Sequence, residues 1–115
     1  MSPEHLELIL KWGKEAQPNE ICGLIVRLPG QDLIRRLGNK AEDPTAEYLI
    51  DNAELVATLA DIIESTGHGI AKDQVTIWHT HPSGYIGPSA GDIDTKVPEL
   101  HYLVVALPNG EATQF

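Results

Sequence analysis

The sequence predicts an α/β fold in which a mixed central sheet is flanked by helices. Segments with apolar residues at helical spacing are interleaved with short apolar runs that glycine and proline bound. A chain of 115 residues with 42% hydrophobic and 22% charged residues has a globular composition and is long enough to bury its own core. We therefore expect a single domain over residues 1–115, with helices layered on one sheet.

The N-terminal segment predicts a helix followed by a hairpin. The helix should begin at Ser2-Pro3-Glu4, which supplies a capping hydroxyl, a first-turn proline and a carboxylate at the positive end of the dipole. It should end before Pro18. The next apolar run, "ICGLIVRL", is typical of a buried strand, and "DLIRRLG" should be its antiparallel partner after a turn at Pro29-Gly30.

A loop and a second helix are expected in the middle of the chain. The segment "GNKAEDPT" has loop composition, and "EYLID" suggests a short strand. The helix should begin near Asp51, with Glu54 completing a capping box, and Gly67 should end it. Its predicted buried face carries Leu55, Val56, Leu59, Ile62 and Ile63.

The C-terminal half predicts three more strands. The first is "QVTIWHT", followed by a loop over residues 82–91 and a short helix that begins near Asp92. A strand "YLVVAL", a turn at Pro108-Asn109-Gly110 and a last strand to Phe115 complete the chain.

Net charge, cysteine content and the length of the apolar runs argue against several classes of protein. A net charge of −9 and a pI near 4.8 disfavour binding to nucleic-acid phosphates. A single cysteine, Cys22, allows no internal disulfide and fits a reducing compartment, and its apolar strand predicts a buried thiol rather than a nucleophile. There is no signal-peptide pattern and no apolar run of about 20 residues, so a soluble cytoplasmic protein is expected.

The segment "WHTHPSGYIGPSAGD" predicts a metal site. In a strand, His79 and His81 project to the same side, and the glycine- and proline-rich loop can fold back to bring Asp92 beside them. Catalytic zinc commonly takes three ligands of these types and leaves a fourth position open. The alternatives are ordinary histidines at the end of a strand and an aspartate that only caps a helix.

Two more side chains are candidates for catalysis. A hydrolytic zinc site needs a base for the attacking water and a donor for the oxyanion. Ser89, one helical turn before Asp92, is the candidate donor, and Glu20, just ahead of the first strand, is the candidate base. A capping or turn role for Ser89 and a solvated loop position for Glu20 remain open. The sequence has neither the H-E-x-x-H of helical metalloproteases nor the paired cysteines of zinc deaminases.

Together these residues resemble the JAMM motif of the JAB/MPN metalloprotease family. The matching pattern is His79-x-His81-Pro82 followed by Ser89 and Asp92, and Glu20 in "NEICGLI" is similar to the family's Glu-x-x-Gly segment. The resemblance implies a cytidine-deaminase-like fold and one zinc ion per chain, held by the two histidines and Asp92. It also implies that Glu20 deprotonates the zinc-bound water and passes the proton to the leaving amine, while Ser89 hydrogen-bonds the oxyanion.

The resemblance further implies a peptidase or isopeptidase that cuts at the C-terminal tail of a ubiquitin-like or sulfur-carrier protein. The stretch "GNKAEDPTAEYLIDNAELV" is similar to the compact prokaryotic and phage-tail branch of the family, which suggests phage tail assembly in a prokaryotic or phage-infected cell. One alternative is a module of the same fold that binds or assembles without catalysis. Another is a zinc hydrolase for small amides or esters.

Overall fold

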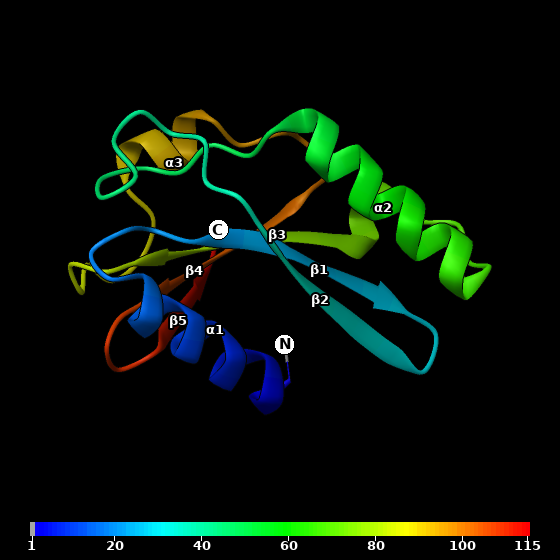
Figure 1. Ribbon diagram of the computed structural model, residues 1–115, viewed down its shortest axis with the longest axis horizontal. Helices are drawn as coiled ribbons and strands as arrows, with labels where there is room; N and C mark the ends of the chain where they lie inside the picture. Colours follow the sequence, from blue (N-terminus) through cyan, green and yellow to red (C-terminus); the bar gives the residue numbers. More distant parts are fainter. Residues whose placement is uncertain (1) are drawn as a thin grey trace.

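The computed structural model describes residues 2–115, as a single sheet with helices on both faces (Figure 1). The elements, in chain order, are α1 Pro3–Ala16, β1 Cys22–Leu28, β2 Gln31–Leu37, α2 Asn52–Thr66, the 3-10 helix η1 Lys72–Gln74, β3 Val75–His81, α3 Ala90–Asp94, β4 His101–Ala106 and β5 Glu111–Gln114. None of the described helices has the length and apolar character of a membrane span.

The sheet is mixed, as the sequence predicts. Its strand order is β2-β1-β3-β4-β5, with β1 antiparallel to both β2 and β3. Strand β3 is parallel to β4, and β5 returns antiparallel along β4. Strand β3 is the central strand of the five and is hydrogen-bonded on both sides, so side chains at its end are held on a rigid base.

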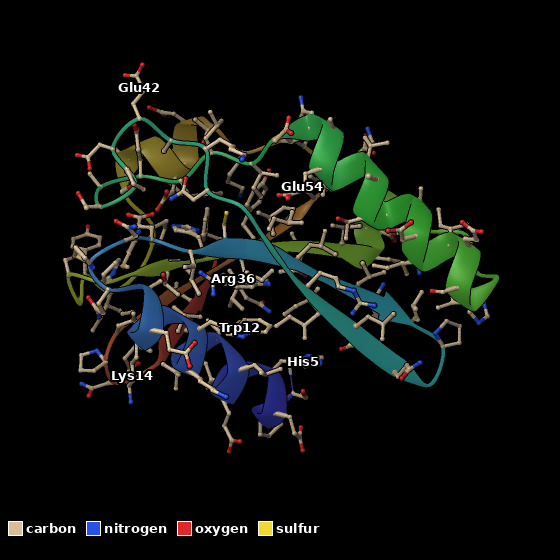
Figure 2. The ribbon with its side chains drawn as sticks, in the orientation of Figure 1. His5, Trp12, Lys14, Arg36, Glu42 and Glu54 are labelled. Atoms are coloured by element: carbon tan, nitrogen blue, oxygen red, sulfur yellow. The ribbon has the colours of Figure 1, made fainter. Side chains whose placement is uncertain are left out.

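Helix α1 covers one face of the sheet. Its Ile9 is fully buried among side chains of β1, β3 and β4, and Trp12 stacks on Trp78 of β3 with ring centroids 6.1 Å apart. Figure 2 labels Trp12 on the side of α1 toward the sheet. Ser2 caps the helix, since its hydroxyl oxygen accepts a hydrogen bond from the backbone N–H of His5. The expected first helix is confirmed.

Helix α2 covers the opposite face, where Leu55, Leu59 and Ile62 pack against the side chains of β1 and β3. Gly67 ends it in the left-handed conformation, with φ 74°, as expected. Since β3 alternates, Ile77 on this face puts the later odd-numbered residues, His79 and His81, on the same side of the sheet.

Three local expectations were wrong. The segment 47–51 forms no strand, because the Asn39 side chain binds the carbonyl of Glu47 and the N–H of Leu49 and ties the segment to a loop. Glu54 does not complete a capping box at Asp51, because its carboxylate accepts a hydrogen bond from the Gly38 N–H instead. The expected apolar face of α2 is also too wide, since two of its members are exposed: Val56 and Ile63.

Candidate metal centre

Three donor atoms converge at the end of β3. The Nε2 atoms of His79 and His81 lie 3.2 Å apart, and Asp92 Oδ2 lies 3.1 Å from the first and 3.2 Å from the second. A tetrahedral zinc ion with bonds of about 2.0–2.1 Å holds its ligands about 3.3 Å apart. The three atoms therefore form a triangle of the size of one face of such a tetrahedron, and two imidazoles with one carboxylate are a donor set suited to zinc.

Both imidazoles project from β3 into buried surroundings. His79 is fully buried and His81 is 6% exposed, which leaves each ring little freedom to rotate. His81 Nδ1 lies 3.1 Å from the Tyr85 carbonyl oxygen, and an N–H donated there leaves Nε2 with a free lone pair. Burial lowers the pKa of His79, although the hydrogen bond to Asp92 opposes this effect, so the neutral form that binds metals is favoured.

Asp92 reaches the histidines from the short helix α3. The Ser89 hydroxyl oxygen accepts from the Asp92 N–H at 3.1 Å, and Asp92 Oδ2 accepts from the Ser89 N–H at 2.9 Å. This reciprocal capping box was the alternative open for both residues, and it is present. Burial tends to raise the pKa of the Asp92 carboxyl, but hydrogen bonds from His79 and Ser89 hold it well below its usual value. The carboxylate is thus ionised and aimed at the imidazoles.

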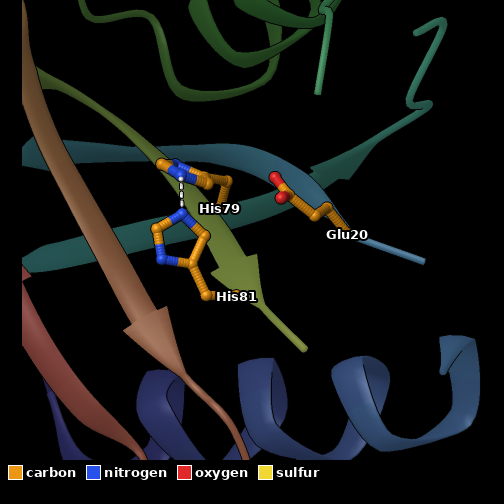
Figure 3. A group of neighbouring side chains, drawn as sticks. All are labelled: Glu20, His79 and His81. Carbon is orange, nitrogen blue, oxygen red and sulfur yellow. Dashed lines mark hydrogen bonds between the residues drawn. The ribbon is translucent and has the colours of Figure 1, made fainter. Parts of the chain in front are cut away.

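Glu20 faces the histidine pair from the segment just before β1 (Figure 3). One ligand atom from each of Glu20, His79 and His81 lies within 4.8 Å of the others. Since Asp92 Oδ2 lies 3.1 and 3.2 Å from the two imidazoles, it is the better third ligand, and Glu20 lies close to the triangle without being one of its corners. The backbone of Glu20 is anchored by its N–H to the Pro44 carbonyl at 2.7 Å.

The pKa values of the Glu20 and Asp92 carboxyl groups are shifted in opposite directions. Burial, followed by the charges of Asp92 and Glu47, raises the pKa of Glu20 to about 8. The pKa of Asp92 is lowered by its hydrogen bonds. Paired carboxyl groups with separated pKa values are typical of sites where one holds charge and the other exchanges protons. A bound divalent cation would lower the pKa of Glu20 and favour its base form.

Gly23 lets β1 lie close to the strand that carries the histidines. A Cβ at this position would meet the Arg35 carbonyl oxygen at 2.1 Å and the Trp78 ring at 2.5 Å. Gly23 pairs with Trp78 in the β1–β3 register, next to the pair formed by Cys22 and His79. The glycine three residues after Glu20 therefore has a packing reason that the sequence pattern alone did not give.

Two hollows meet at Ser89. One has a volume of about 410 Å³ and the other about 190 Å³, and Ala46 also borders both. Glu20 and His81 line the larger hollow, and Asp92 and Tyr48 line the smaller. These candidate residues thus line two neighbouring hollows that share Ser89 and Ala46.

The structure brings together all five residues that the sequence singled out: Glu20, His79, His81, Ser89 and Asp92. Cys22 pairs with His79 in the β1–β3 register but has no part in the group of donor atoms. Its thiol is fully buried, its Sγ contacts the carbonyls of Leu37 and Gly38, and burial raises its pKa to about 12, which fits the predicted inert thiol.

Sequence reasoning missed one neighbour of the site. The Tyr48 ring stacks on the His79 imidazole, with centroids 4.2 Å apart and planes at 22°. The only sequence signal at Tyr48 was the apolar segment "EYLID", which indicated a strand and not a contact with β3.

Comparison with known proteins gives a family and a similar fold. The family described as prokaryotic homologs of the JAB domain matches residues 2–115. A protein from Salinibacter ruber, whose structure was solved in solution, superposes with a TM-score of 0.56 at 22% identity, over 97% of this chain and 75% of that one. At this identity the likeness supports the fold alone. No protein of curated function matches the chain.

Proposed function

The chain belongs to the family of prokaryotic homologues of the JAB domain, and from this premise we propose that it is a zinc-dependent peptidase or isopeptidase. The observation that carries the proposal is the triangle of donor atoms from His79, His81 and Asp92, with Glu20 close to both histidines. We also place the fold in the cytidine-deaminase-like group.

The five residues divide among three roles in the proposed reaction. His79, His81 and Asp92 would hold one zinc ion, which when bound polarises a carbonyl and lowers the pKa of water. Glu20 takes the proton of the attacking water and later delivers it to the leaving amine. The Ser89 hydroxyl, which can donate once the oxyanion forms beside it, stabilises that negative charge.

The partner we propose is a ubiquitin-like or sulfur-carrier protein with an extended C-terminal tail. The two hollows that meet at Ser89 provide a path for an extended chain on both sides of the reacting bond. An extended tail would add backbone hydrogen bonds to its side-chain contacts there, as strand-like peptides do. Glu47 and Asp92 border the smaller hollow, so a tail without acidic residues fits best.

The setting we propose is the cytoplasm of a prokaryote or a phage-infected cell, with phage tail assembly as the leading role. The match to prokaryotic homologues of the JAB domain supports the prokaryotic part of this setting.

Metal analysis is the first test of the proposal. Elemental analysis of the purified chain should give about one zinc per chain, and Asp92→Ala should give little. Asp94→Ala is the matched control, because Asp94 lies on the same short helix but is exposed. A zinc content that is equal in both variants, or absent from the parent chain after incubation with zinc, would refute the proposed site.

Processing assays test the catalytic residues. Ubiquitin-like and sulfur-carrier proteins fused to a C-terminal extension, and a panel of small peptide amides, would be incubated with the zinc-loaded chain. Glu20→Gln should lower the turnover of the tailed protein at least about 100-fold while zinc content stays near one per chain. Unchanged processing by Glu20→Gln would remove Glu20 from the mechanism. Faster cleavage of the small amides than of any tailed protein would instead favour a small-molecule hydrolase.

A further inference from the structure

The two histidines of the candidate metal centre are held in different ways. His81 Nδ1 lies 3.1 Å from the Tyr85 carbonyl oxygen, which fixes the ring and its tautomer. His79 Nδ1 is buried and has no hydrogen-bond partner among residues 2–115. A metal-binding histidine almost always donates its second N–H to an acceptor, so the orientation of His79 must come from something else.

Aromatic packing surrounds the His79 ring instead. Tyr48 covers one face of the imidazole, with centroids 4.2 Å apart and planes at 22°, and Phe115 meets the ring at 88° with centroids 6.1 Å apart. Neither contact supplies a hydrogen-bond acceptor for Nδ1 of the kind a carbonyl would, but together the two rings restrict rotation of the imidazole about its Cβ–Cγ bond. Rotation would carry Nε2 away from Asp92 Oδ2, which it contacts at 3.1 Å.

Tyr48 is itself fixed by the loop that carries it. The Asn39 side chain donates to the Glu47 carbonyl and accepts from the Leu49 N–H, so it clamps the residues on both sides of Tyr48. The Lys40 N–H donates to the Leu49 carbonyl at 2.8 Å. These bonds hold residues 47–49 in an irregular path that places the Tyr48 ring against His79 of β3.

We propose that Tyr48 is a positioning residue that orients the His79 imidazole for metal binding by stacking on it. The inference rests on the proposed function, because it requires the triangle of His79, His81 and Asp92 to bind zinc. The stacked face of the ring is what matters, and the phenolic hydroxyl is not part of the role. Tyr48 acts through His79 and touches neither the substrate nor the reacting atoms.

The test compares three variants of the full chain. Tyr48→Phe keeps the stacked ring, Tyr48→Leu removes it, and Tyr85→Leu is a matched control at the second tyrosine near the pair. The Tyr85 ring lies 5.8 Å from the His81 ring, but its contribution to His81 is a backbone carbonyl that survives the substitution. Zinc affinity would be measured by competition with a chromophoric chelator, and coordination geometry by the visible spectrum of the cobalt-substituted chain.

We expect Tyr48→Leu to weaken zinc binding about 10- to 100-fold and to change the cobalt spectrum, as loss of the support of a ligand usually does. Tyr48→Phe and Tyr85→Leu should bind zinc within about threefold of the parent chain. If Tyr48→Leu fails to fold, Tyr48→Met preserves apolar volume without a planar ring and takes its place.

Three results would overturn the inference, each in a different way. If a folded Tyr48→Leu or Tyr48→Met chain binds zinc as tightly as the parent, stacking does not position His79, while the proposed function stands. If the parent chain itself binds no zinc, the proposed function and this inference fall together. A loss of affinity in Tyr48→Phe equal to that in Tyr48→Leu would assign the effect to the hydroxyl and also contradict the proposal.

Discussion

Replacing Glu20 with glutamine should stabilise the metal-free protein, and the gain should grow with pH. Burial and the neighbouring carboxylates raise the pKa of Glu20 from 4.5 to about 8. Below pH 4.5 the group is protonated in both the folded and the unfolded chain, so its contribution is zero. Between pH 4.5 and about 8 only the folded chain keeps the proton, so the stability of the parent protein falls as pH rises. Glutamine is neutral throughout and removes this loss.

The expected size of the effect follows from the same shift. At 1.36 kcal/mol per pKa unit, a rise from 4.5 to about 8 corresponds to roughly 5 kcal/mol for a group wholly shielded from water. The Glu20 side chain lines an open hollow of about 410 Å³, where water and salt screen its charge. We therefore expect Glu20→Gln to gain about 1–2 kcal/mol in free energy of unfolding near pH 8 and almost nothing near pH 4.

Urea unfolding followed by tryptophan fluorescence would measure this gain, since the Trp12–Trp78 pair bridges α1 and the sheet. The experiment needs a chelator in the buffer, and Glu42→Gln, at an exposed loop position, is the control. Added zinc should shrink the gain, because a cation favours the ionised carboxylate. A Glu20→Gln chain that is less stable than the parent near pH 8, or a gain that does not depend on pH, would refute the reasoning.

Three further predictions concern packing, catalysis and metal removal. Gly23→Ala should lower the free energy of unfolding by about 3 kcal/mol or more, because the added Cβ would meet a backbone oxygen at 2.1 Å. Gly69→Ala, which has open space around it, is the control and should change the free energy of unfolding by less than about 1 kcal/mol in the same urea titration. Ser89→Ala should lower kcat about 100- to 1,000-fold with little change in KM, and Ser89→Thr should retain more of the activity; a change in KM alone would contradict an oxyanion role. A strong chelator should abolish cleavage and lower Tm, and zinc but not magnesium should restore both, as calorimetry and the processing assay would show.

The sequence was sufficient for the elements with regular patterns and local signals. The hairpin of β1 and β2 follows from two apolar runs around Pro29-Gly30, and the placement of His79 and His81 on one side follows from the period of a strand. The segment around Tyr48 was mispredicted because its conformation depends on the side chain of Asn39, about ten residues away, which competes with strand pairing.

In the candidate site, too, the contacts within one element could be predicted from the sequence, and those between elements could not. The proximity of Ser89 and Asp92 could be predicted because one helical turn joins them, and the two residues do form a capping box. The proximity of Glu20 to the histidines depends on the antiparallel register of β1 on β3, which no local pattern specifies. The stacking of Tyr48 on His79 is a contact between a loop and a strand with no periodic signature.

The ligands of the candidate metal centre come from one rigid element, β3, and one element that opens easily, α3. Two histidines belong to β3, whose amides are bonded to strands on both sides, whereas Asp92 belongs to a five-residue helix held by its own cap. Helices this short open locally at little cost in free energy, so α3 can detach while the sheet stays intact. Zinc should therefore exchange on the timescale of α3 opening, faster than global unfolding. In hydrogen exchange, the amides of α3 should gain protection when zinc binds, while those of β3 are protected with or without it.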